Sequence, residues 1–243
     1  MKTRNVLMMV GVLMTVAVIV GCVNTETRPF VTDVFGDAAP TGDTTNELKV
    51  AATLVGDYLY TYCVTNGGAM ITGPKQTVTW RNLPVGSRFV RAVLPAPTDV
   101  LAIPAFLNGY PVTSIGELAF SNCAKVKSVT IPEGVTSIEA FAFPMCDQLK
   151  SVTIPSTVTN IGLHAFGSCR KLESVTIPSP TINIGYLAFG FCKTLKSVTI
   201  LSDVMSIESS AFKGCTDLKS VVIPKGATVE KGAFPEGCKV QRK

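Results

Sequence analysis

The sequence has few of the residues that carry most enzyme chemistry. Among 243 residues it contains one histidine, His164, and one tryptophan, and only 16% of its positions are charged. A lone histidine without an orienting carboxylate is a poor acid–base catalyst, and zinc needs several converging ligands. The sequence also lacks a glycine-rich phosphate loop and the acidic spacing of a calcium loop. We therefore expect no enzyme activity, no metal and no cofactor.

The first 21 residues have the order of features found in an export signal. Lys2 and Arg4 precede an apolar run from Val6 to Val20, which is short for a membrane-spanning helix. The run ends in Ile19-Val20-Gly21-Cys22, which resembles the lipobox of bacterial lipoproteins. This resemblance implies cleavage before Cys22 and lipidation of Cys22, and two or more acyl chains anchor a protein stably. An ordinary secretory signal and an uncleaved membrane helix are the alternatives.

The charge balance is too weak to indicate a nucleic-acid partner. The formal net charge is +5, and it falls to +3 if Lys2 and Arg4 are removed with the signal. Binding to phosphate backbones needs a concentrated basic stripe. We expect no nucleic acid among the partners, and we expect the lipid anchor to be the contact with the membrane.

Two different segments follow the predicted lipid site. Residues 22–48 are rich in Thr, Asp, Gly and Pro, which is typical of a flexible tether. Residues 49–113 predict a small β-rich N-terminal cap. Within it, DYLYTYCV and AMITG flank an Asn66-Gly67-Gly68 turn and predict a β-hairpin. A second hairpin-like unit spans residues 76–93.

The segment 114–240 is built from 23-residue repeats. Six cysteines lie 23 residues apart, at Cys123, Cys146, Cys169, Cys192, Cys215 and Cys238, and an Ala-Phe pair precedes each. Strand-like segments such as LKSVTIP and LESVTIP lie between these markers and alternate apolar with polar residues. One unit cannot close a core, but stacked units can bury their apolar residues against each other. The repeats therefore predict a solenoid with a parallel β-sheet on one face.

The cysteine column predicts buried thiols rather than disulfides. Neighbouring turns of a parallel sheet are about 4.8 Å apart, which is within reach of a disulfide. Equivalent side chains in a solenoid point in parallel, however, whereas a disulfide needs Cβ atoms that converge. Buried thiols can instead act as small apolar side chains.

At these residues the sequence resembles the BspA-like leucine-rich repeat family. The stretch SVTIPSTVTNIGLHAFGSC, from Ser151 to Cys169, matches the family's repeating unit throughout. The resemblance implies a right-handed, leucine-rich-repeat-like coil on a bacterial surface, and a role in adhesion and protein–protein contact. It carries no particular ligand with it.

The outward columns of the repeated strands are the main candidate binding face. They consist of a lysine column interrupted by Glu173, a serine column, and a threonine column that ends at Val222. The residues are Lys127, Lys150, Glu173, Lys196 and Lys219; Ser128, Ser151, Ser174, Ser197 and Ser220; and Thr130, Thr153, Thr176 and Thr199. Such a hydroxyl-rich, mildly basic face suits an acidic protein or a glycan. The alternative is a solvated face that is polar for solubility.

Two further surfaces are candidates. The variable positions around each Ala-Phe pair carry large apolar residues, which would form a patch if they were exposed together; they are Leu118, Phe141, Met145, Leu163, Tyr186, Leu187 and Phe191. In the cap, Trp80 with Arg81 and Arg88 could bind a glycan or a carboxylate. The alternative is that Trp80 covers the open end of the repeat core.

Taken together, these features predict a lipid-anchored protein of the cell envelope, held at the outer membrane or cell surface, whose repeats bind another protein. A glycan-binding or envelope-scaffold protein is the second hypothesis.

Overall fold

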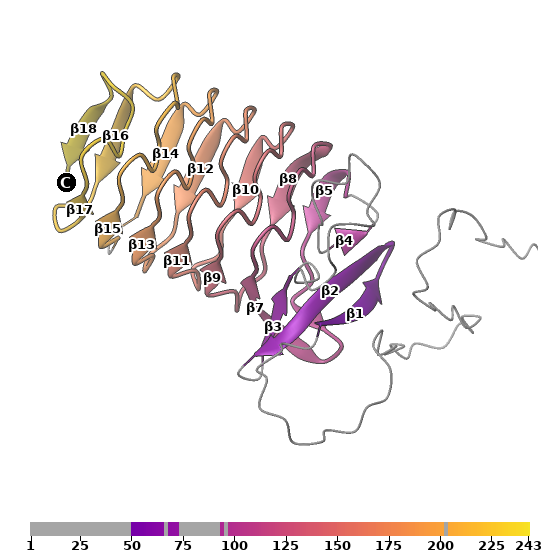
Figure 1. Ribbon diagram of the computed structural model, residues 1–243. Coiled ribbons are helices and arrows are strands. Elements are labelled where there is room, and N and C mark those ends of the chain that lie inside the picture. The colour runs from indigo at the N-terminus through magenta and orange to yellow at the C-terminus, as the bar shows by residue number, and fades with distance from the viewer. Residues whose placement is uncertain (1–49, 66–67, 73–92, 95–96, 202–203) are drawn as a thin grey trace, which may run out of the picture.

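The computed structural model describes residues 50–65, 68–72, 93–94, 97–201 and 204–243, shown in colour in Figure 1. These residues form strands and turns, with no α-helix among them. Within the same ranges, no helix has the length and hydrophobicity that crossing a membrane requires. The predicted signal segment, Cys22, and the residues Trp80, Arg81 and Arg88 lie outside the described part of the chain.

The N-terminal cap is an antiparallel unit joined to the repeats. Strands β1 (Val50–Val55) and β2 (Tyr58–Thr65) pair antiparallel, and β2 forms the expected hairpin with β3 (Gly68–Ile71). The short strand β4 (Val93–Leu94) also pairs with β2. On its other edge, β3 pairs parallel with β7 (Tyr110–Ile115), the first strand of the second sheet. The cap and the repeats therefore share one continuous sheet.

Each repeat contributes one strand to each of two parallel ladders (Figure 1). The ladder that we call the main sheet consists of two hydrogen-bonded sheets that follow one another along the stack. The first contains β5 (Asp99–Ala102), β8 (Val126–Thr130) and β10 (Ser151–Thr153), and the second contains β12 (Ser174–Ile177), β14 (Ser197–Ile200), β16 (Ser220–Ile223) and β18 (Lys239–Arg242). The second sheet continues from β7 through β9 (Ser137–Ile138), β11 (Asn160–Ile161), β13 (Asn183–Ile184), β15 (Ser206–Ile207) and β17 (Thr228–Val229). Strand β6 (Phe106–Leu107) pairs antiparallel with β7.

The parallel solenoid expected from the repeats is thus confirmed. The second sheet was not foreseen, because its repeat strands are only two residues long and show no alternation of apolar and polar residues.

A third side, made of turns, closes each coil. It runs from the end of a second-sheet strand to the start of the next main-sheet strand, for example residues 162–171. Backbone hydrogen bonds join successive turns here as well, as from the N–H of Phe166 to the carbonyl of Ala188 at 2.7 Å. The main-chain groups on all three sides are therefore satisfied by the neighbouring coils, as buried backbone groups require.

The core between the three sides contains two ladders of identical residues. Six phenylalanine rings, at Phe120, Phe143, Phe166, Phe189, Phe212 and Phe234, stack with centroids 4.8 to 5.3 Å apart and nearly parallel planes. The cysteines lie beside them as free thiols, as predicted. The thiol of Cys169, for example, donates to the carbonyl of Phe143 at 3.3 Å. Burial raises the pKa of this thiol well above its usual range, so it remains protonated.

Candidate binding surfaces

The main sheet aligns the predicted polar columns. Ser151 lies opposite Ser128 and Thr153 opposite Thr130, and the same register continues on the C-terminal side in β12, β14 and β16. The valines between them point into the core, because side chains alternate across a strand. The structure therefore brings the predicted serine and threonine residues together on one exposed face. Their role in binding stays a prediction.

The lysine column lies at the start of these strands. Backbone hydrogen bonds order it, because Lys150 N–H donates to the Lys127 carbonyl, Glu173 N–H to the Lys150 carbonyl and Lys196 N–H to the Glu173 carbonyl. Sequence analysis missed Lys239 in the free edge strand β18, which lies opposite Ser220. The last repeat has a shorter spacing, and this hid Lys239 from the 23-residue count.

The lysines of this column differ in their partners. Lys127 Nζ lies 2.6 Å from the Asp99 carboxylate, with both side chains mostly exposed. Lys219 Nζ donates to the Thr216 carbonyl at 2.7 Å. Among the residues that the structure describes, Lys150 and Lys196 form no ion pair. These two ammonium groups can therefore pair with carboxylates of another molecule without first breaking an ion pair to any residue in the described ranges.

The third side carries large apolar residues in an unusual backbone conformation. Phe141, His164 and Leu187 occupy equivalent positions with φ between 51° and 54°. This left-handed region is uncommon for residues other than glycine. At two of these positions the backbone N–H bonds to the next coil, from Phe141 to the Leu163 carbonyl at 2.8 Å and from His164 to the Tyr186 carbonyl at 2.9 Å, which helps the turns to tolerate this conformation.

The side chains on this third side are only partly covered. Phe141, His164 and Leu187 are half-buried, whereas Tyr186 and Phe191 are 42% and 41% exposed. The His164 ring lies 5.3 Å from the Phe141 ring, and burial lowers the pKa of His164 below its usual value. More than half of each of these side chains is thus covered, and only the accessible remainder of Met145, Leu163, Tyr186 and Phe191 is available to a partner.

Neither a metal site nor the predicted cap site can be described from the structure. The described residues contain no cluster of His, Cys, Asp and Glu that could hold a metal ion. The predicted cap site of Trp80, Arg81 and Arg88 falls in the undescribed range 73–92. Exposed columns on the main sheet and apolar residues on the third side are therefore the surfaces that the structure offers to a partner.

Parallel coils, a repeated Ala-Phe-x-x-Cys turn and a free polar face define a leucine-rich-repeat solenoid. A family model described as "BspA type Leucine rich repeat region" matches residues 113–241 in six copies. The chain therefore belongs to the BspA-type leucine-rich repeat family. No curated protein was found that matches the sequence.

Solved structures of bacterial proteins resemble most of this chain. A leucine-rich repeat protein of T. pallidum is 25% identical with a TM-score of 0.58, over 75% of this chain and 82% of its own. A leucine-rich cell surface protein of Faecalibacterium prausnitzii is 26% identical with a TM-score of 0.55, over 79% of this chain and 54% of its own. The pneumococcal vaccine antigen PcpA, at 18% identity and a TM-score of 0.55, covers 79% of this chain and 48% of its own, and shows the fold alone. The chain thus spans only about half of these last two proteins.

Proposed function

We propose that this protein is a lipid-anchored bacterial surface protein that binds another protein through the exposed face of the main sheet. The observation that carries the proposal is the alignment of lysine, serine and threonine columns on successive strands, with Lys150 and Lys196 unpaired within the described part of the chain. A regular face of this kind offers many equivalent contacts, and solenoid proteins commonly use such extended surfaces for binding.

The chemistry of this face favours an acidic partner. Lysines on neighbouring strands lie about 5 Å apart and share one sign of charge, which attracts carboxylates and accelerates encounter. The serine and threonine hydroxyls next to them can both donate and accept hydrogen bonds. Glu173 interrupts the lysine column, so the face has two basic segments rather than one continuous stripe.

The predicted lipid anchor would hold this face outside the cell. A flexible tether of residues 22–48 has an end-to-end distance on the order of 30 Å, which would separate the solenoid from the membrane. The cell-surface description of the F. prausnitzii protein supports the same location. Adhesion is the role that we propose for the complex, because an anchored binding protein ties its cell to whatever it binds.

The binding proposal can be tested with the soluble 23–243 fragment and immobilised host matrix proteins. We expect saturable binding that weakens as salt is raised, because screening reduces the attraction between exposed charges. Lys150→Glu with Lys196→Glu should weaken binding, whereas Lys225→Glu with Lys231→Glu should not, although both pairs change the net charge equally. Absence of saturable binding to any protein ligand, or equal losses in the two double variants, would refute the proposal.

The anchor needs a separate test in the intact cell. We expect Cys22→Ser to prevent processing and membrane retention, which fractionation and mass spectrometry of the N-terminal peptide would show. A variant that remained lipid-anchored would contradict the assignment of Cys22.

Glycan binding is the second candidate, and the hydroxyl columns of the main sheet favour it because sugars present many donors and acceptors. A glycan array with the wild type and Trp80→Ala separates the two functions. Sugar binding that depends on Trp80 supports the second, and an array without signal counts against it.

A further inference from the structure

The third side carries an apolar patch that is independent of the main sheet. We define the third-side patch as Met145, Leu163, Tyr186 and Phe191, which are all exposed. They come from successive coils, because the Phe141 N–H bonds to the Leu163 carbonyl and the His164 N–H bonds to the Tyr186 carbonyl. Isolated exposed apolar residues are ordinary, but several gathered on one surface mark an interaction site.

Glycines on this side make room for the patch and for the residues that support it. A Cβ atom added to Gly214 would lie 2.6 Å from the ring of Phe191, so this ring packs against the backbone of the next coil. Likewise Leu187 lies over Gly190, where an added Cβ would be 2.6 Å from its Cδ2. One side of the ring is therefore held against the backbone before a partner binds, while the rest stays exposed. This reduces the entropy lost on binding.

Basic residues border the patch on the side of the main sheet. Lys193 follows Phe191 by two residues, and Lys213 lies on the next coil, where its carbonyl accepts the Phe191 N–H at 2.7 Å. Arg170 is 3.8 Å from Asp147 in a contact between largely exposed groups, which holds it only weakly. In the described ranges, Lys193 and Lys213 form no ion pair.

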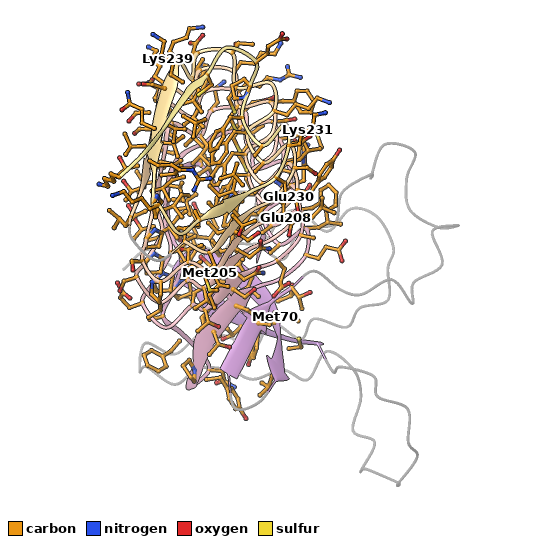
Figure 2. All side chains as sticks on the ribbon, turned by 90° about the vertical axis from the view of Figure 1, so that its left-hand side faces the viewer. Met70, Met205, Glu208, Glu230, Lys231 and Lys239 are labelled. Atoms are coloured by element: carbon orange, nitrogen blue, oxygen red, sulfur yellow. The ribbon has the colours of Figure 1, made fainter. Side chains whose placement is uncertain are left out.

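Figure 2 views the stack from its C-terminal end and shows how the sides are separated. Two labelled lysines lie apart, at opposite limits of the third side. One is Lys239, at the start of β18 in the main sheet, and the other is Lys231, on the last coil at the position of Tyr186. Met205, which is exposed beside the second sheet, lies away from both of them. A molecule bound to the third-side patch would therefore leave the central columns of the main sheet free.

We propose that the third-side patch binds an acidic amphipathic segment of a partner protein. Apolar side chains of the segment contact Tyr186 and Phe191, and its carboxylates pair with Lys193 and Lys213. The patch spans three coils, or about 10 Å at the spacing of parallel strands, which matches roughly two turns of a helix. Rings that are more than half covered and packed against the neighbouring coil suit a protein segment better than a lipid bilayer, because side chains that insert into lipid have to project from the surface.

The first test selects the partner chemistry without assuming its identity. A random-peptide phage library is panned on the full chain held in nanodiscs of phosphatidylcholine. We expect the selected peptides to combine acidic with aromatic or aliphatic residues. Tyr186→Ser with Phe191→Ser should weaken their binding by about tenfold or more, as for the central residues of an interface. Ile182→Ser with Met205→Ser, which removes two even more exposed apolar residues beside the second sheet, should leave it unchanged.

Two methionines report where the peptide binds. Met145 lies in the patch and Met205 lies beside the second sheet, so oxidation of Met145 by peroxide should slow when a selected peptide is bound, while oxidation of Met205 should not. Lys193→Glu with Lys213→Glu should abolish this protection.

Several results would overturn the proposal. They are failure to select any peptide, selected peptides without acidic residues, and equal losses in the two serine double variants. Protection of Met145 by nanodiscs containing phosphatidylglycerol, in the absence of peptide, would identify an anionic membrane surface as the occupant instead. The main-sheet variants Lys150→Glu and Lys196→Glu distinguish this site from the binding face of the proposed function. They should leave peptide binding to the third-side patch intact.

Discussion

The stack of phenylalanine rings runs through the core, and its interior and terminal members differ in the number of rings they contact. Phe166 lies between Phe143 at 5.1 Å and Phe189 at 5.3 Å. Phe120 begins the stack, and among the residues that the structure describes its ring stacks on that of Phe143 alone, at 4.8 Å. Both side chains are fully buried. Replacing each by leucine therefore removes two ring contacts in one variant and one in the other, at matched burial.

The expected difference between the variants is one aromatic pair. Each substitution loses buried area and leaves a small cavity, and these losses are similar because both sites are closed to solvent. An aromatic pair contributes about 0.5–1.5 kcal/mol beyond its buried area. Phe166→Leu should therefore lower the free energy of unfolding by about 0.5–1.5 kcal/mol more than Phe120→Leu.

Urea unfolding of the full chain, followed by circular dichroism and by the fluorescence of Trp80, measures this difference. The two signals must give coincident transitions, and the variants must keep the dependence on urea of the wild type, because repeat proteins can unfold in parts. If Phe120→Leu cost as much as Phe166→Leu, or more, ring stacking would not contribute to the stability of the coils beyond simple burial.

Three other measurements test individual positions. Alkylation of the folded protein should label Cys238 before the other ladder cysteines, because it alone among them is only partly buried. The thiolate is the reactive form, and burial raises the pKa of Cys238, so labelling should increase with pH but require a higher pH than an exposed thiol does. Equal labelling along the ladder would contradict the buried-thiol structure. Gly185→Ala places a Cβ 2.9 Å from the Gly162 carbonyl carbon and should cost about 1–3 kcal/mol, whereas Gly226→Ala meets no atom within 4 Å and should be neutral or slightly stabilising in the same melts. Burial lowers the pKa of His164 from 6.5, so the unfolded chain takes up the proton first and the contribution of neutral His164 is lost as pH falls below about 6.5; His164→Gln should flatten that part of the stability profile, and an unchanged profile would show that His164 does not cause it.

The repeated residues could be predicted because they report the period directly. The cysteine and phenylalanine columns fixed the length of each coil, and the alternation in LKSVTIP indicated which side of the main strands is buried. Register then followed, since a parallel solenoid sets each residue beside its equivalent 23 positions away. The free thiols also followed from this geometry, because parallel side chains do not converge.

The third side could not be predicted in the same way. Propensity assigns left-handed backbone to glycine or asparagine, yet Phe141, His164 and Leu187 adopt it here. Hydrogen bonds between neighbouring coils select this conformation, and no single-residue preference reveals them. The glycines at 167 and 190, which lie under His164 and Leu187, were a usable signal. They occur three residues after a large side chain, at the distance needed for that side chain to fold over the turn.

The modest net charge of the sequence understates how basic the main sheet and the third side are to a partner, because some of its carboxylates accept hydrogen bonds within the fold. Glu208 accepts hydrogen bonds from the Tyr186 N–H at 2.8 Å and from Asn183 at 2.9 Å. Glu230 accepts from the Ser209 N–H at 2.8 Å, and these two glutamates lie near each other in Figure 2, away from Lys239. The lysines of the main sheet and third side have fewer internal partners. A count of charges gives the hydrogen-bonded carboxylates and the lysines equal weight, whereas the lysines are the charges available to a partner. Both proposed surfaces therefore favour acidic ligands despite a formal charge of only +5.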